Sequence, residues 1–277
     1  MKNPSLLFDL TGRVAIITGG MGFLGQKYAE TIACAGGIAV MVDILIPGAA
    51  EQCTDTWKSR FGAKACALKC DITKLEEVHL CLAEVLKRYG HVDILINNAA
   101  NNPKMENTSE VNFSRLEHFP LAQWQSDLAV GLTGSFLCSQ VFGAEMAKRK
   151  KGVIVNISSD LGVIAPDQRI YRQEGLPEEQ QPAKPVTYSV VKHGLIGLTK
   201  YLATYWANSG VRVNAFSPGG VFNGQPEDFV ARLTNLIPMA RMADYDELQG
   251  AIVFLCSDAS SYMTGANLMI DGGRTCW

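Results

Sequence analysis

The sequence predicts an α/β class fold: a Rossmann-like, doubly wound, mainly parallel sheet of seven strands with helices on both faces. Short apolar runs rich in Val, Ile and Leu alternate with longer helical patterns. Such runs are typical of strands buried on both faces of a parallel sheet. The alternation of strand and helix favours a doubly wound arrangement. The runs expected as strands are residues 13–19, 38–43, 63–70, 92–98, 152–158, 211–217 and 267–272.

Helical patterns fill the spaces between these runs. The stretch "EEVHLCLAEVLKRYG" ends at Gly90, and a long pattern, "LAQWQSDLAVGLTGSFLCSQVFGAEMAKRK", follows Pro120. No repeat or linker divides the chain, so residues 1–277 are expected to form a single NAD(P)-binding domain. The irregular stretch 165–187, rich in Pro, Gln and Glu, is interpreted as an active-site loop insertion, since long loops in compact domains are usually functional or mobile.

Composition and charge exclude several classes of protein. The formal net charge is −2, which gives no sign of a nucleic-acid partner. No apolar run is long enough to predict a membrane span, and the first residues carry no secretory pattern. The eight cysteines form no CxxC pair, so we expect no metal site and reduced thiols in a cytoplasmic protein.

A glycine-rich turn follows the first expected strand. The stretch "TGGMGFLG", residues 18–25, contains Gly20, Gly22 and Gly25 in a Gly-x-Gly-x-x-Gly pattern that opens a helix. Without a Cβ atom the backbone can approach a pyrophosphate, whose charge meets the helix N-terminus. Asp43 ends the second strand, where a carboxylate can accept hydrogen bonds from a ribose and repels a 2′-phosphate. The pattern therefore predicts a dinucleotide site that favours NAD over NADP.

The stretch "YSVVK" places Tyr188 and Lys192 one helical turn apart. A free tyrosine is almost fully protonated at neutral pH, and a nearby ammonium favours its phenolate. Any helix can hold this pair by chance. Downstream of a nucleotide site, however, a proton acceptor is what hydride transfer from an alcohol requires.

Seven short motifs stand in the order found in one enzyme family. They are "TGGMGFLG" (18–25), "CDIT" (70–73), "NNAA" (97–100), "ISS" (157–159), "YSVVK" (188–192), "NAFSPGG" (214–220) and "IDGG" (270–273). With these motifs the chain resembles the short-chain dehydrogenase/reductases, in their single-domain branch. A weaker resemblance, carried by the inserted loop and "SPGGVFNGQ", is to oxidoreductases of bacterial surface-glycan and flagellin-sugar modification.

The resemblance implies roles for residues at matching positions. Tyr188 resembles the catalytic acid/base, Lys192 the residue that binds the nicotinamide ribose and lowers the tyrosine pKa, and Ser159 the hydroxyl that orients the substrate. Asn97, with Ala99, is implied beside the cofactor. The residues expected to contact the dinucleotide are Gly19, Gly22, Phe23, Leu24, Gly25, Asp43, Asp71, Ile72, Asn98, Ala99, Lys192, Pro218, Gly219 and Val221.

The sequence departs from the family pattern at three places. Phe23 occupies the position of the usual middle glycine, a spacing commoner in the longer branch of epimerases and dehydratases. Gly131 replaces the usual asparagine at a helix kink, either to relieve crowding or at a cost to the proton relay. The separation between Ser159 and Tyr188 is about twice the usual one because of the inserted loop.

The insertion suggests the substrate class. We expect Arg169, Arg172 or Lys184 to bind a phosphate or carboxylate. The residues expected to bind substrate are Asn101, Asp160, Arg169, Arg172 and Gln225, with Asn102 and Lys104 as further donors. These polar groups favour a sugar-like substrate, although a solvated loop whose acids cancel its bases has the same composition.

The sequence thus predicts an NAD-dependent oxidoreductase acting between a secondary alcohol and a ketone of a polar small molecule. The alternatives are a dehydratase or epimerase that retains its NAD, favoured by the glycine spacing, and a non-catalytic nucleotide-binding regulator, favoured by Gly131. The resemblance also implies a homodimer or homotetramer formed through helices at about 120–148 and 186–208.

Overall fold

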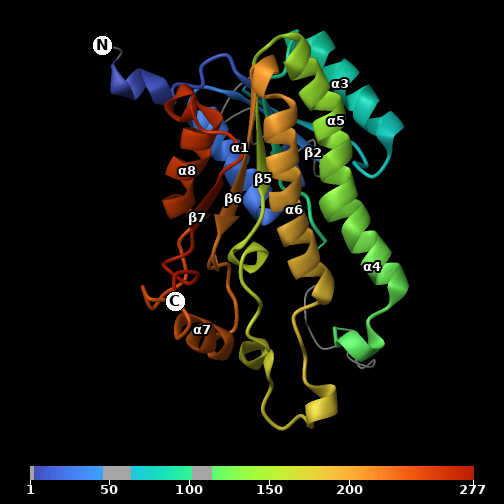
Figure 1. Cartoon of the computed structure of the whole chain (residues 1–277), viewed down its shortest axis with the longest axis vertical. Helices are drawn as coiled ribbons and strands as arrows, with labels where there is room; N and C mark the ends of the chain where they lie inside the picture. The colour runs from blue at the N-terminus through green and yellow to red at the C-terminus, as the bar shows by residue number, and fades with distance from the viewer. Residues whose placement is uncertain (1–2, 46–63, 102–113) are drawn as a thin grey trace.

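A single sheet forms the centre of the computed structural model, which describes residues 3–45, 64–101 and 114–277 (Figure 1). The strands are β1 (Val14–Thr18), β2 (Ile38–Asp43), β3 (Ala65–Lys69), β4 (Ile94–Asn97), β5 (Gly152–Ile157), β6 (Val211–Pro218) and β7 (Asn267–Ile270). Their order is β3-β2-β1-β4-β5-β6-β7, and all neighbouring pairs are parallel. The seven expected strands are confirmed, each within two residues of its expected ends.

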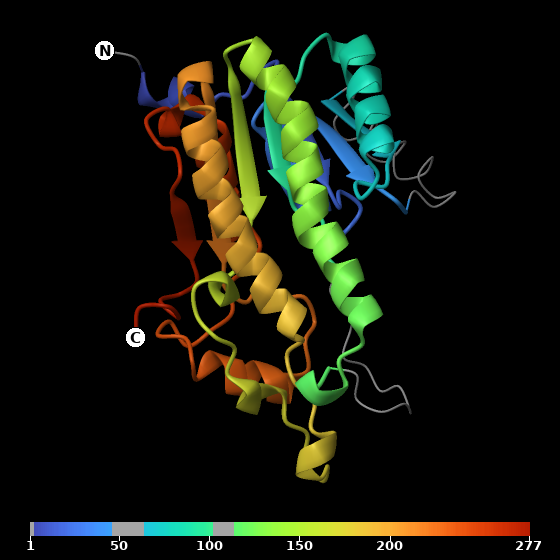
Figure 2. The ribbon, with the colours of Figure 1, turned by 45° about the vertical axis from the view of Figure 1, so that its right-hand side comes forward.

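Helices cover both faces of this sheet. On one face lie α3 (Leu75–Tyr89), α5 (Gly134–Lys148) and α6 (Val186–Tyr205), and on the other lie α1 (Phe23–Cys34) and α8 (Asp246–Cys256). Helix α4 (Leu121–Leu128) leads into α5, and Figure 2 shows α4 and α6 extending together beyond the carboxyl ends of the strands. The predicted doubly wound fold is therefore confirmed.

Each face of the sheet has its own apolar core. Val78, Phe142 and Met146 pack on one face, whereas Tyr28 and Ile252 pack on the other. All five side chains are fully buried or nearly so. Burying one such side chain stabilises the fold by roughly 1.5–3 kcal/mol, so the two cores hold the strand ends in fixed positions.

The inserted segment is anchored at its first half. It forms short 3-10 turns at Gln168–Tyr171 and Glu178–Gln180 beyond the carboxyl ends of the strands, and the first of these turns lies beside α7 (Glu227–Thr234) (Figure 1). Ile170 is buried with Leu233, and its carbonyl accepts a hydrogen bond from Arg232 Nε at 2.9 Å. The loop therefore has a fixed contact at the edge of the molecule where a parallel sheet binds ligands.

Several other features concern only the described part of the chain. No helix in it is long and apolar enough to cross a membrane. The seven cysteines within it are free, and none of its His, Cys, Asp and Glu side chains gather as a metal-binding group. Cys53, Asn102 and Lys104 lie outside the described residues.

Asp93, buried at the amino end of β4, provides a test of the fold away from the ligand-binding edge. Its Oδ2 atom accepts from the Val14 amide at 3.0 Å, and its Oδ1 atom lies 3.3 Å from Arg149 Nη1. Asp93→Ala leaves the buried Val14 amide unpaired and removes the carboxylate beside Arg149, which keeps its hydrogen bond to the Val92 carbonyl. We therefore expect the free energy of unfolding to fall by about 2–3 kcal/mol in urea titrations. His91→Gln, on the partly exposed neighbour, should cost less than about 1 kcal/mol. Equal losses for the two variants would contradict this assignment.

Candidate active site

A cavity of about 670 Å³ opens at the carboxyl ends of the strands. It begins beside β1 and β4, where the strand order reverses, the position at which doubly wound sheets bind ligands. Most residues expected from the sequence line it. They are Gly19, Gly22, Phe23, Leu24, Gly25, Asp43, Asp71, Ile72, Asn98, Ala99, Asn101, Ser159, Asp160, Tyr188, Lys192, Pro218, Gly219, Val221 and Gln225.

The glycine turn between β1 and α1 has no room for side chains. Gly19 has a φ of +62°, and a Cβ atom there would lie 2.8 Å from Ala99 Cα. A Cβ atom on Gly25 would lie 2.1 Å from the Gly19 carbonyl oxygen. The turn therefore requires glycine, and it aims the N-terminus of α1 at the cavity, where an anionic group is favoured.

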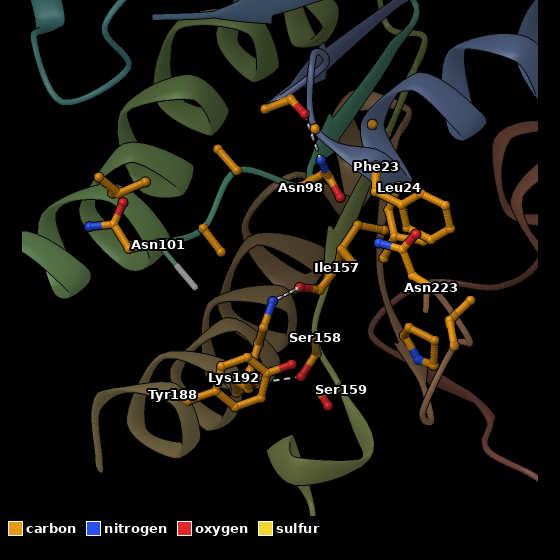
Figure 3. A pocket seen from close by; sticks show the side chains of 18 of the residues that line it. Phe23, Leu24, Asn98, Asn101, Ile157, Ser158, Ser159, Tyr188, Lys192 and Asn223 are labelled. Carbon is orange, nitrogen blue, oxygen red and sulfur yellow. Dashed lines mark hydrogen bonds between the residues drawn. The ribbon is translucent and has the colours of Figure 1, made fainter. Parts of the chain in front are cut away.

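Asn98 holds this turn against the end of β4. Its Nδ2 atom donates to the carbonyls of Thr18 at 3.0 Å and Gly19 at 3.2 Å (Figure 3). The Thr18 hydroxyl in turn accepts from the backbone amides of Asn98 and Ala99. Asn97 does not line the cavity as expected. Its side chain is buried and donates to Asn156 Oδ1 at 2.8 Å, inside the core.

Two carboxylates lie at the far end of the same cavity. Asp43 Oδ2 accepts from the Met21 amide at 3.0 Å, which ties the end of β2 to the glycine turn. Asp71 accepts from the Thr73 hydroxyl, and this hydrogen bond lowers the pKa of the Asp71 carboxyl. Hydroxyl groups of a ribose or amines of a base are suitable partners for both acids.

Ser159, Tyr188 and Lys192 meet at the other end (Figure 3). The Lys192 ammonium donates to the Ile157 carbonyl at 2.8 Å, and the Ser158 hydroxyl donates to the Lys192 carbonyl at 2.8 Å. Lys192 Nζ lies 5.7 Å from the centre of the Tyr188 ring. Two hydrogen bonds therefore fix α6 against the end of β5, with its tyrosine and lysine facing one cavity.

Burial determines the charge state of these groups. It lowers the pKa of Lys192 to about 8, with a further contribution from Lys184. Burial also raises the pKa of Tyr188, and a hydrogen bond with Ser159 opposes this rise. Desolvation of the phenolate is the largest of these effects, and Lys192 is not among the groups that shift the pKa of Tyr188 in this structure.

A buried ion pair positions the serine. Arg274 Nη1 lies 2.6 Å from Asp160 Oδ2, with both side chains more than nine-tenths buried. Asp160 Oδ1 accepts from the Ser159 hydroxyl at 2.7 Å and from the Leu161 amide at 2.8 Å. Asp160 was expected to bind substrate, but both of its oxygens are already occupied by groups of the chain itself.

The charged loop does not form the expected clamp. Arg169 pairs with Asp167 at 2.6 Å and Arg172 with Glu178 at 2.5 Å, on exposed turns. Neither arginine is among the described residues that line the cavity. Lys184 does line it, with its amine 3.8 Å from the centre of the Tyr188 ring. Of the three cations expected to bind substrate, Lys184 is therefore the one that lines the cavity.

Gly131 lies in a π-helical turn, Ala129–Thr133, between α4 and α5, which confirms the expected kink. A Cβ atom there would lie 2.6 Å from Val191 Cγ1, so crowding against α6 requires the glycine. The Gly131 carbonyl accepts from the Ser135 hydroxyl at 2.9 Å. Next to Gly131 and Lys192 a small cavity of about 20 Å³ remains, which is large enough for one water molecule.

Comparison with known proteins agrees with this geometry. A family model described as short chain dehydrogenase matches residues 13–171, and a second, described as Enoyl-(Acyl carrier protein) reductase, matches residues 177–275. The chain belongs to the short-chain dehydrogenase family. As a short-chain dehydrogenase it is an oxidoreductase that acts on CH–OH groups of a small molecule with a nicotinamide dinucleotide.

Several named short-chain dehydrogenases are similar over nearly their whole length. An NADP-dependent mannitol dehydrogenase of Alternaria alternata is 34% identical over 96% of this chain and 94% of its own. An NAD-dependent glycerol dehydrogenase of Listeria innocua is 32% identical over 97% and 96%. The crystal structure of a gluconate 5-dehydrogenase from Burkholderia cenocepacia, in complex with NADP and tartrate, has a TM-score of 0.84 at 27% identity, covering 99% and 100%.

Sequence reasoning missed some lining residues of this short-chain dehydrogenase. Arg274 follows "IDGG" directly, and its position after a family motif was the available signal. Asn223, Phe229 and Met242 also line the cavity; Asn223 lies within "SPGGVFNGQ", a stretch already singled out, whereas the stretches around Phe229 and Met242 gave no signal.

The buried charge of Lys192 gives a prediction about stability. Its folded-state pKa, about 8, is below the ordinary value of 10.5, so the unfolded chain binds the proton more tightly. After the lost hydrogen bond to Ile157 is allowed for, we expect Lys192→Met to raise stability by about 1–2 kcal/mol at pH 7. The stability advantage of the variant should shrink as pH rises from about 8 toward 10.5. Over this range Lys192 in the folded wild type becomes neutral, so the wild type no longer bears the cost of burying its charge.

Chemical denaturation at pH 7 and pH 10 tests this expectation. Lys200→Met, an exposed lysine on the same helix, serves as the control and should change stability by less than about 0.5 kcal/mol. A Lys192→Met protein less stable than wild type at pH 7 would show that the hydrogen bond to Ile157 outweighs the desolvation cost.

Proposed function

We propose that the protein is an NAD-dependent dehydrogenase that transfers a hydride between the nicotinamide and a secondary alcohol or ketone of a polar, polyol- or sugar-like substrate. The observation that carries the proposal is one continuous cavity with two ends. Asp43 and the glycine turn lie at one end, and Ser159, Tyr188 and Lys192 meet at the other. A dinucleotide bound in this cavity would contact both ends at the same time.

The chain's own residues have distinct tasks in this reaction. The bound nicotinamide supplies the hydride chemistry. Tyr188 takes the proton of the substrate hydroxyl or returns it in reduction, and Ser159, oriented by Asp160, binds the same oxygen. Lys192, fixed by the Ile157 carbonyl, supplies hydrogen bonds for the nicotinamide ribose, and its charge acts together with that of the bound nicotinamide to favour the phenolate.

The small cavity beside Lys192 offers the proton a path away from Tyr188. Asn101, Asp127 and Gly131 line it together with both catalytic side chains. One water molecule there would have several polar neighbours, which is what an ordered water requires. The cavity beside Gly131 therefore has room for a relay water, which favours the catalytic function over the non-catalytic regulator.

Two features support the substrate class and the assembly. Asn101, Asn223 and Gln225 give the cavity polar walls, and named relatives act on mannitol, threitol and glycerol. For assembly, we propose a homodimer or homotetramer, because Phe136, Tyr201 and Tyr205 leave apolar surface exposed on α5 and α6. The resemblance to surface-glycan enzymes stays a prediction.

Replacing Tyr188 tests the proposed chemistry. Tyr188→Phe keeps the ring but removes the proton acceptor, so we expect kcat/KM for polyol oxidation to fall by at least about 100-fold. NADH formation at 340 nm measures this, and NADH affinity should change by less than about threefold. A variant with undiminished turnover would refute the role of Tyr188. Product formed without net NADH release would instead favour the NAD-retaining epimerase or dehydratase.

Cofactor preference has its own test at Asp43. Asp43→Asn keeps an oxygen that can accept from the Met21 amide but removes the charge that repels a 2′-phosphate. We expect wild-type kcat/KM to favour NAD, and the ratio for NAD over NADP to fall by about tenfold or more in the variant. Asp258→Asn, near the opposite end of the sheet, is the control. A wild-type preference for NADP would contradict the NAD assignment.

A further inference from the structure

The substrate end of the cavity has more positive than negative charge. Its charged lining residues are Lys184, Lys192 and Arg274, against one acid, Asp160. That acid is already engaged by Arg274 and by the Ser159 hydroxyl. Asp43 and Asp71 lie at the other end, with the glycine turn, and do not balance the excess.

Two cations of this group, Lys184 and Lys192, have no carboxylate partner within the described parts of the chain. The Lys192 ammonium already donates to the Ile157 carbonyl, whereas the Lys184 amine lies over the Tyr188 ring. Burial lowers the pKa of Lys184 to about 8, and Asp160 opposes this shift. At neutral pH the amine is therefore still mostly charged in a poorly solvated place, and an anionic ligand would offset that cost.

The backbone holds Lys184 in place independently of its charge. Its amide donates to Gln168 Oε1 at 2.8 Å, and the next residue, Pro185, is the N-cap of α6. Arg169 and Arg172, in the same insertion, are each neutralised by a neighbouring acid. Both arginines of the insertion are thus paired with acids, and Lys184 is its one cation directed to the site.

We infer that the substrate carries a carboxylate within a few carbon atoms of the reacting carbinol, and that Lys184 binds it. This inference rests on the proposed function, because Tyr188 defines where the carbinol lies. The Lys184 amine lies 3.8 Å from the centre of the Tyr188 ring, so we expect it to be within reach of substituents next to a carbinol bound at the Tyr188 phenol. The substrate class is therefore a polyhydroxy acid.

The chemistry of the amine favours a carboxylate over a phosphate. A lysine supplies a point charge, whereas phosphates are commonly bound by the arginine fork or by several backbone amides. The one arginine that lines this end, Arg274, already has its charge balanced by Asp160. Asn223, which also lines the cavity, offers its side-chain amide to the hydroxyls of such an acid, whereas the Gln225 amide is already bonded to the backbone of Asn223 and Val221.

Matched substrates test the inference. We would compare aldonates with the alditols of the same carbon chain, with the neutral aldonamides, and with sugar phosphates, using NAD and the whole protein. The wild type should prefer aldonates by about tenfold or more in kcat/KM. In Lys184→Met, kcat/KM for aldonates should fall by about 10- to 100-fold, mainly through KM, while alditols change by less than about threefold.

Two further variants keep the comparison interpretable. Arg169→Met removes a paired cation of the same loop and should leave both substrate classes within about twofold of wild type. Lys184→Arg keeps the charge and should restore most of the aldonate preference. Thermal unfolding of each variant checks that the fold is intact.

The outcomes separate this inference from the proposed function. Equal loss of kcat on aldonates and alditols would mean that Lys184 acts only through the Tyr188 ring, which overturns the inference. Wild-type preference for alditols, or for sugar phosphates, also overturns it while the dehydrogenase proposal stands. If nothing is oxidised, calorimetry of aldonate binding to the NADH complex decides. Binding that Lys184→Met abolishes supports the carboxylate site without the function, and no binding to the wild type overturns it.

Discussion

The hydrogen bond from Lys192 to the Ile157 carbonyl joins the two elements that carry the chemistry. Ile157 ends β5, and Ser159 follows it two residues later, while Tyr188 and Lys192 lie on α6. A second bond, from Ser158 to the Lys192 carbonyl, holds the same contact from the other side. The sheet fixes the end of β5, and these two hydrogen bonds fix the position of α6 relative to it. Ser159 and Tyr188 therefore face one cavity in a defined arrangement.

Positive charge under partial burial is the second constraint on this site. Lys192 and Lys184 both have a lowered pKa, each chiefly through burial, and Lys184 also depresses that of Lys192. The site thus holds two cations that repel each other with little solvent to screen them. Stability is lost in this arrangement, and a ligand with matching negative charge regains it. Shifted pKa values and buried like charges of this kind are common at sites of ligand binding and proton transfer, where they reduce the stability of the fold.

The fold could be predicted from the sequence because its signals are local. Each apolar run reports burial of its own strand, and the glycine turn follows from backbone geometry within eight residues. Residues at strand ends, such as Asp43, were placed correctly for the same reason. Side chains that meet across long separations were not. Whether Arg169 or Lys184 reaches the cavity depends on which acids the folded loop brings near each one, and composition carries no such information.

The inserted segment acts on the site through its anchored ends. Ile170 is held by α7 at one end, and Pro185 begins α6 at the other. Between them the loop satisfies its own charges in solvent, as Arg172 does with Glu178. Sequence change in this middle part costs little, whereas Lys184 is followed directly by Pro185, the N-cap of the catalytic helix. A loop built this way can alter substrate choice at one anchored position while the hydride and proton chemistry on α6 and β5 stays unchanged.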